Sequence, residues 1–152
     1  MTTITRESPL ADDLALLFQR HHDHCHAETP PESIHMMPAG ALDAPDVVFL
    51  VVRDAGRPVG MGAVKTIAPG HGELKSMHIL SEYRGRGLSR RLLDALTDAA
   101  RDAGLSQLSL ETGTEAIFAP ARALYVAAGF TETGPFGAYR PDPNSAFFTR
   151  KV

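Results

Sequence analysis

The chain has 152 residues, of which 43% are hydrophobic and 22% charged, values typical of one globular domain with a packed core. Its net charge of −3 argues against a nucleic-acid-binding domain, which usually carries a basic excess, and its longest apolar run, Val47 to Val52, is too short to span a membrane. Because the lone Cys25 can form neither an intrachain disulfide nor a multi-cysteine zinc site, we expect a soluble protein of the reducing cytoplasm without a targeting leader.

The first part of the chain predicts a short strand followed by a helix. Residues Ile4 to Glu7 have strand character, and Ser8-Pro9 then provide an N-cap and a proline at the first helical position. Apolar residues recur at helical spacing between Leu10 and Phe18, and this pattern fades in the polar cluster from His21 to His26. After a proline-rich break, we expect a second short helix around Ser33 to Met37.

Three consecutive strands follow and predict an antiparallel meander. Val47 to Arg53 is almost wholly apolar, as in a strand buried on both faces. Turns then lead to the strands Val59 to Ile67 and Glu73 to Leu80. Period-two alternation in the third strand places four side chains on one face, namely Glu73, Lys75, Met77 and Ile79.

The second half of the chain adds two helices and further strands. A helical apolar stripe between Gly87 and Gly104 precedes a strand at Leu105 to Glu111, and a helix over residues 116–128 precedes two late apolar runs. There is no internal repeat, low-complexity tract or linker. The sequence therefore predicts one α+β domain over residues 1–152, with a mixed, mostly antiparallel twisted sheet of about six to seven strands and about four flanking helices.

A segment with two glycines one residue apart lies between the third strand of the meander and the following helix. It reads Arg84-Gly85-Arg86-Gly87-Leu88-Ser89, and its glycines let several backbone N–H groups converge with the helix N-terminus on a diphosphate. An ordinary solvated basic turn is the alternative. Two other nucleotide motifs do not fit, because GxxxxGK[ST] is absent and Arg90 replaces the third glycine of GxGxxG.

This segment resembles the R/Q-x-x-G-x-G/A signature of the GNAT family of acyl-CoA-dependent N-acetyltransferases, with Ser89 in place of the final Gly or Ala. The segment Ala123 to Phe130 resembles the LYxxxGF motif of the same family. The resemblance covers the chain from Val47 to the C-terminus and implies the GNAT fold, in which the strand before the glycine loop splays from its neighbour. It also implies acetyl-CoA as co-substrate, with its pantetheine arm on Met77, His78 and Ile79 and its phosphates on the amides of Arg84, Gly85, Arg86, Gly87, Leu88 and Ser89.

The resemblance also implies a proton donor and a proton acceptor. Tyr125 stands where many members protonate the leaving thiolate, and a half-buried tyrosine that only packs beside Phe130 is the alternative. Because an alkylamine has a pKa of ~10.4, a base is useful, and Glu73 matches the glutamate of histone-acetylating relatives. The alternatives are a structural carboxylate bonded to Lys75, with Glu111 or a water chain serving as the base.

The acceptor amine is expected to bind where the first helix, residues 32–42 and the tail between Phe130 and Phe147 border the splayed strands. If Lys65 and Lys75 face this cleft, the acceptor carries a carboxylate or phosphate beside its amine. The polar residues expected there are His35, Lys65, Lys75, Glu111 and Arg140.

The histidine cluster suggests a metal site, because His22 and His26 lie one helical turn apart. Without clear third and fourth ligands, the preferred interpretation is a polar helix end whose imidazoles suit the negative helix pole, and no metal is predicted. Cys25 as an acyl-carrying nucleophile would need a lowered pKa and the correct pocket, and this role is not expected.

These observations predict an N-acetyltransferase that moves an acetyl group from acetyl-CoA to a primary amine of a small molecule or peptide by direct attack in a ternary complex. The alternatives are a catalytically silent acyl-CoA-binding module and a protein-interaction domain of the same fold. A homodimer is expected, because a second subunit often covers exposed sheet edges in this architecture. Nucleic acids and membranes are not expected as partners.

Overall fold

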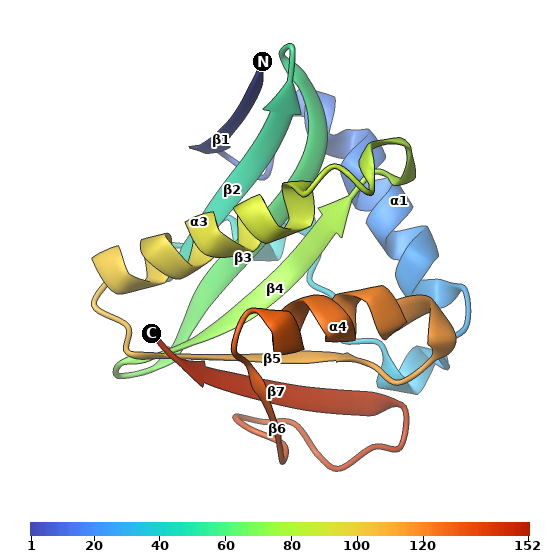
Figure 1. Cartoon of the computed structure of the whole chain (residues 1–152), viewed down its shortest axis with the longest axis vertical. Helices are drawn as coiled ribbons and strands as arrows, with labels where there is room; N and C mark the ends of the chain where they lie inside the picture. Colours follow the sequence, from blue (N-terminus) through green and yellow to red (C-terminus); the bar gives the residue numbers. More distant parts are fainter.

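The computed structural model describes residues 1–152 and contains one seven-stranded sheet with helices on both faces (Figure 1). The strand order is β1-β2-β3-β4-β5-β7-β6, and all neighbours pair antiparallel except β4 and β5, which are parallel. The strands are β1 (Thr2–Arg6), β2 (Val47–Asp54), β3 (Arg57–Ala68), β4 (His71–Ile79), β5 (Gln107–Gly113), β6 (Thr131–Thr133) and β7 (Ser145–Lys151). The helices are α1 (Ala15–His26), α2 (Ala39–Leu42), α3 (Leu88–Asp102) and α4 (Ala119–Ala127). The predicted mixed, mostly antiparallel sheet with four helices is confirmed.

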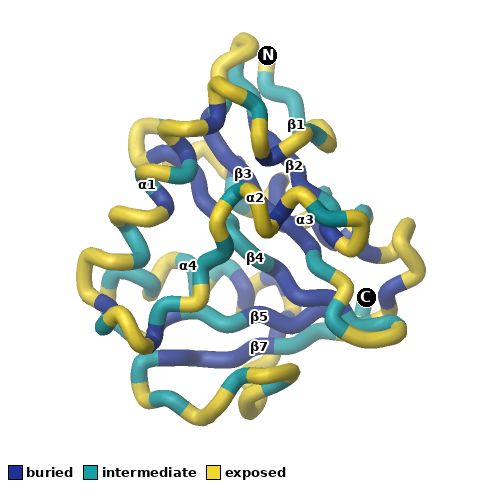
Figure 2. Tube along the Cα trace, turned by 180° about the vertical axis from the view of Figure 1, so that it is seen from behind, coloured by how far each residue is buried: buried dark blue, intermediate teal, exposed yellow.

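The core follows from apolar central strands and one apolar helix face. Val51 and Val52 of β2 are fully buried, as expected for a strand that is covered on both faces. On α3, the residues packed against the sheet recur at helical spacing, namely Leu88, Leu92, Leu93, Leu96 and Ala100. Gly62 of β3 permits this close packing, because a Cβ atom there would lie only 2.8 Å from Leu96 Cδ1. Figure 2 shows that the buried parts of the backbone follow the central strands.

The first helix differs from the sequence prediction. The Ser8 hydroxyl accepts a hydrogen bond from the Leu10 N–H in a local turn and caps no helix, so α1 begins only after a following 3₁₀ turn. The helix then continues through the polar cluster from His21 to His26. The short helix expected around Ser33 to Met37 is not formed, and α2 follows that segment.

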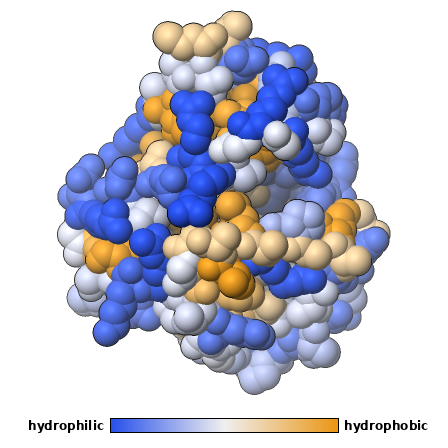
Figure 3. All heavy atoms as spheres, in the orientation of Figure 1, coloured by the Kyte–Doolittle hydropathy of each residue, from blue (hydrophilic) through white to orange (hydrophobic).

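The two faces of the sheet carry different helices. α3 and α4 lie on one face and α1 on the other (Figure 1). Neighbouring residues of β4 reflect this, because Met77 contacts Tyr125 of α4 while the His78 ring packs against the His21 ring of α1 with centroids 5.4 Å apart. In the space-filling view, α4 presents an apolar surface beside the hydrophilic surface of α3 (Figure 3). No helix is both long and apolar enough to cross a membrane.

Strand β4 contains a bulge at Ser76. Lys75 and His78 pair with Ala63 and Met61 of β3, so two residues of β4 lie opposite a single position of β3. Ser76 adopts a φ of 57°, which is uncommon for a residue with a side chain and costs free energy. The bulge therefore shifts the alternation of side chains along the rest of the strand.

This shift overturns one sequence prediction about β4. Glu73 and Lys75 lie on the α1 face of the sheet together with His78, whereas Met77 and Ile79 lie on the face covered by α3. The prediction that Glu73, Lys75, Met77 and Ile79 share one face is thus wrong, because simple alternation does not account for the extra residue.

Strands β4 and β5 diverge soon after they begin to pair. Their parallel ladder consists of His71–Gln107, Gly72–Leu108 and Glu73–Ser109 and then stops. Beyond this point β4 remains paired with β3, and β5 remains paired with β7. The predicted splay is confirmed, and the backbone from Lys75 to Ile79 has no strand partner on its β5 side.

Candidate active site

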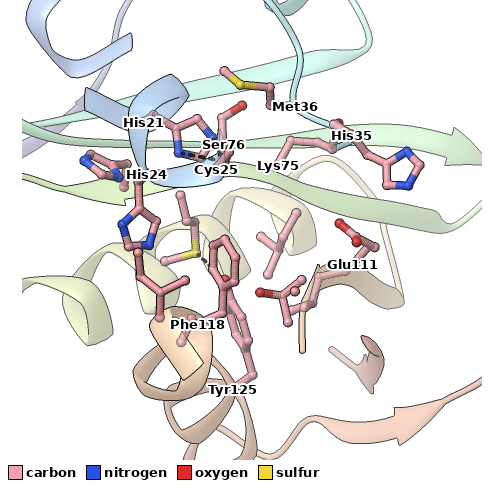
Figure 4. Close-up of a pocket in the computed structure, with 18 of the residues that line it drawn as sticks. His21, His24, Cys25, His35, Met36, Lys75, Ser76, Glu111, Phe118 and Tyr125 are labelled. Atoms are coloured by element: carbon pink, nitrogen blue, oxygen red, sulfur yellow. Dashed lines mark hydrogen bonds between the residues drawn. The ribbon is translucent and has the colours of Figure 1, made fainter. Parts of the chain in front are cut away.

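A cavity of about 360 Å³ occupies the gap between the splayed strands. Its walls come from α1, β4, β5 and α4 and from the loops before α2 and after β6 (Figure 4). Because α1 and α4 lie on opposite faces of the sheet, the cavity connects the two faces through the gap. A donor molecule and an acceptor molecule can therefore enter from different sides and meet between the strands.

Tyr125 lies on the α4 side of the cavity. Its hydroxyl lies 3.9 Å from the Met77 sulfur, to which it donates a weak hydrogen bond across the gap (Figure 4). Burial and, to a smaller extent, the negative charge of Glu111 raise the pKa of Tyr125 to about 12. The hydroxyl is therefore protonated at neutral pH and can act as a proton donor. Its position matches the role that the sequence predicts for it, and that role stays a prediction.

Two carboxylates lie on the α1 side of the cavity. Glu73 and Ser109 pair across the parallel ladder, so Glu111, two residues further along β5, extends from the same face of the sheet as Glu73. Burial raises the pKa of Glu111 to about 7, and a hydrogen bond from the Ser145 hydroxyl at 2.7 Å acts in the opposite direction. A carboxylate with this pKa can accept a proton near neutral pH.

Glu73 is held in a buried network. Its Oε2 accepts hydrogen bonds from the Tyr139 hydroxyl at 2.5 Å and from the Lys75 ammonium at 3.3 Å. Lys75 also donates to Tyr139 Oη at 3.1 Å and to the His35 carbonyl at 3.1 Å. Burial and the hydrogen bond to Glu73 raise the pKa of Tyr139, so its hydroxyl remains a donor. This carboxylate is thus engaged by two partners, whereas Glu111 has a single neutral one.

Tyr139 is the cavity residue that the sequence analysis missed. It comes from the loop between β6 and β7, and its ring packs against those of Phe136, Phe147 and His35. The concentration of aromatic residues in this glycine- and proline-rich tail was a signal that the loop packs inward. The hydrogen bond between Tyr139 and Glu73 could not be predicted from the sequence, because these residues are far apart along the chain.

The glycine loop lies at the end of the cavity next to the start of α3. Gly85 and Gly87 have φ angles of 77° and 75°, and a Cβ atom at either would face open space. Gly87 is the N-cap of α3 and supplies no side-chain cap, so the first amides of the helix have no side-chain partner. The Arg84 Nε donates to the Ile79 carbonyl at 3.2 Å, and Ser89 completes this end of the cavity.

The other predicted cofactor residues divide into two groups. Met77, His78 and Ile79 line the cavity. Leu88 is buried in the core, and the Arg86 guanidinium lies over the Tyr83 ring at 4.7 Å instead of in the cavity.

The predicted acceptor residues are only partly brought together. His35, Lys75 and Glu111 line the cavity. Lys65 and Arg140 do not line it, although Lys65 pairs with Glu73 across the sheet.

The end of α1 adds a neutral wall to the cavity. His21, His24 and Cys25 line it (Figure 4), and the His78 ring packs against those of His21 and His24. Burial lowers the pKa of His21 to about 4 and that of His78 to about 3, and it also lowers the pKa of His24. Burial raises the pKa of Cys25 to about 11, so its thiol is protonated at neutral pH and is a poor nucleophile. No group of three or more His, Cys, Asp or Glu side chains is placed to hold a metal ion.

Comparison with known proteins identifies related sequences and folds. The sequence pattern of the Acetyltransferase (GNAT) family matches residues 11–130. The IAA acetyltransferase of Azospirillum brasilense is 43% identical over 152 residues, covering 99% of this chain and 97% of that protein. The uncharacterized N-acetyltransferase YsnE of Bacillus subtilis is 38% identical over 134 residues, covering 86% of this chain and 89% of that protein. The crystal structure of the PaiA N-acetyltransferase of Thermoplasma acidophilum with coenzyme A has the same fold, with a TM-score of 0.75 at 15% identity over 100% of this chain and 99% of that chain.

The buried histidines predict that the free energy of unfolding falls as the pH drops below about 6.5. In the folded protein His21 and His78 stay neutral down to about pH 4 and about pH 3, whereas both take up protons near pH 6.5 in the unfolded chain. Stability is thus lost as the pH falls through this window. The raised pKa of Glu111 acts in the opposite direction, because stability increases as the pH falls from about 7 toward the ordinary glutamate pKa.

Replacing His78 isolates the contribution of one buried histidine. Below pH 6.5, the slope of the unfolding free energy against pH should be smaller in H78Q than in the wild type by about 1.4 kcal/mol per pH unit. Urea unfolding at several pH values between 5 and 7 measures this slope. The matched control is H22Q, whose side chain is 52% exposed. An equal slope in wild type and H78Q would contradict a neutral buried imidazole.

Proposed function

Because the chain belongs to the GNAT acetyltransferase family, we propose that it transfers an acetyl group from acetyl-CoA to a primary amine of a small molecule or peptide by direct attack in a ternary complex. The observation that carries this proposal is the cavity through the sheet. It joins the glycine loop at one end to Tyr125 in the middle and to two carboxylates on the opposite face.

The chain's own residues fit the cofactor. The open amides at the start of α3 and the side chain of Arg84 suit a diphosphate. The backbone from Lys75 to His78, which has no strand partner on its β5 side, can pair with an extended amide-containing arm. Acetyl-CoA supplies the acetyl group as a thioester, whose sulfur leaves as a thiolate.

Glu111 is the stronger candidate for the base that accepts a proton from the amine. Its pKa of about 7 and its single neutral hydrogen-bond partner leave it free to take up a proton. Glu73, the base expected from the sequence, shares its carboxylate with Lys75 and Tyr139. These two hydrogen bonds hold the Glu73 carboxylate in its network, whereas Glu111 is not held by a charged side chain.

Tyr125 is the proposed proton donor to the leaving sulfur. Its hydroxyl already points toward the sulfur of Met77, four residues beyond the last pair of the β4–β5 ladder. Its pKa of about 12 is above that of a free thiol, so proton transfer to a thiolate at this position needs the thiolate to be desolvated and strongly basic. The buried position of Tyr125, beside Met77 and the rings of Phe130 and Phe148, favours such an environment.

Three expectations about the whole protein stay predictions. Residues 1–152 are proposed to form a single acetyltransferase domain. The strands β1 and β6 are the free edges of the sheet, where a second copy would pair in the expected homodimer. The cytoplasm is the expected location.

The Y125F variant should lower kcat by ~10²–10⁴ if the hydroxyl protonates the leaving thiolate. The dissociation constant for acetyl-CoA should change little, because the ring and its packing remain. Initial rates of CoA release and a binding titration measure the two effects. The Y83F variant, whose ring lies outside the cavity, is the matched control and should retain the wild-type kcat. An unaltered kcat in Y125F would reject the role.

The pH dependence of kcat/KM distinguishes the two candidate bases. For an alkylamine acceptor, the neutral fraction of the amine increases with pH up to its pKa of ~10.4, so kcat/KM rises with pH. Ionisation of Glu111 should add a change of slope to this profile near pH 7, called the break below. The E111Q variant should lose this break and most of its activity, whereas E73Q should keep the break. Loss of the break in E73Q alone would assign the base to Glu73 instead.

A further inference from the structure

The α1 side of the cavity, where the acceptor amine is proposed to bind, has no lysine or arginine free to bind an anionic substituent. Lys75 is the only lysine or arginine that lines this side, and its side chain is 12% exposed. Its three ammonium protons have three acceptors at 3.1 to 3.3 Å, namely Glu73 Oε2, Tyr139 Oη and the His35 carbonyl. Binding a substrate carboxylate would require one of these hydrogen bonds to break.

The other basic side chains near the cavity do not supply a free cation on the α1 side either. Arg84 lies at the cofactor end, where its guanidinium donates to the Ile79 carbonyl. The imidazoles of His21 and His78 are buried and neutral. Lys75 is paired with Glu73, so the Glu111 carboxylate is the charge left without a cation whenever it is ionised, and the acceptor side is then suited to a positively charged ligand.

Two hydroxyl groups on the cavity wall have no hydrogen-bond partner. Thr29, from the segment after α1, is 9% exposed, and its Oγ1 is unpaired. The Ser76 Oγ, at the bulge of β4, is also unpaired. An unpaired buried hydroxyl is costly, so a ligand that offers a neutral donor or acceptor gains by pairing with it. Ile34 and Met36 add apolar surface to the same wall.

We propose that the acceptor is a small primary amine with an uncharged hydrogen-bonding substituent, such as a hydroxyl or carboxamide, and an apolar side chain, and that amines carrying a carboxylate or phosphate are excluded. This inference rests on the proposed acetyl transfer. Glu111 attracts the ammonium before its proton is removed, and Thr29 and Ser76 bind the uncharged substituent. The carboxylate or phosphate acceptor predicted from Lys65 and Lys75 is replaced, because Lys65 does not line the cavity and Lys75 is already paired.

Four matched amines test the inference, namely L-leucine, L-leucinamide, L-leucinol and isoamylamine. CoA release from acetyl-CoA is measured with each, and kcat/KM is expressed per concentration of neutral amine, because the pKa of the amine differs among the four compounds. The kcat/KM for leucinamide and for leucinol should exceed that for leucine by at least ~10-fold. This is the factor expected when the leucine carboxylate has to displace a hydrogen bond of Lys75. The kcat/KM for leucinol should also exceed that for isoamylamine, which has no hydroxyl to form a hydrogen bond.

The outcomes separate this inference from the proposed function. CoA release that is as fast or faster with leucine contradicts the inference and leaves the acetyltransferase activity intact. Absence of CoA release with every amine contradicts the proposed function and the inference together.

Replacing Thr29 and Ser76 tests directly whether their hydroxyls bind the uncharged substituent of the acceptor. The T29V and S76A variants should each reduce the ratio of kcat/KM for leucinol to that for isoamylamine by several-fold, because only leucinol has a hydroxyl to pair. Using a ratio removes any general effect of the substitution on folding or on acetyl-CoA binding. An unchanged ratio in both variants would show that neither hydroxyl contacts the substituent.

Discussion

The site depends on the point at which strand β4 stops pairing with β5. A parallel ladder that continued to the end of both strands would close the sheet and leave no route between its faces. The ladder stops at Glu73–Ser109, while the pairing of β4 with β3 and of β5 with β7 keeps both strands in place. The unpaired β4 backbone and the cavity are two results of this one separation.

The separation also sorts the chemical groups by face. Tyr125 reaches the gap from the side of α4, and Glu73 and Glu111 reach it from the side of α1. Burial then sets the protonation states, since it keeps the tyrosine and the histidines neutral and brings the pKa of Glu111 close to neutral pH. A hydroxyl that can donate a proton and a carboxylate that can accept one thus lie on opposite sides of one cavity.

The sequence predicted those parts of the protein that depend on local patterns. The apolar strands, the stripe of α3, the glycine loop and the position of Tyr125 are all readable from spacing and motif. The bulge at Ser76 was not, because serine carries no signal for a φ of 57°, and this one residue moved Met77 to the other face. The network of Glu73, Lys75 and Tyr139 was not predictable either, because it joins a strand to a distant loop.

Binding of an acyl-CoA in the gap between β4 and β5 is the step on which the proposed function depends, and ligand-dependent stability tests this binding most directly. Thermal unfolding is measured with acetyl-CoA and, as controls, with ATP and NAD at the same concentrations. At one hundred times Kd a ligand stabilises the folded state by ~2.7 kcal/mol, which raises the midpoint by roughly 5–10 °C for a domain of this size. We expect such a shift with acetyl-CoA and none of similar size with ATP or NAD. No shift at millimolar acetyl-CoA would contradict it.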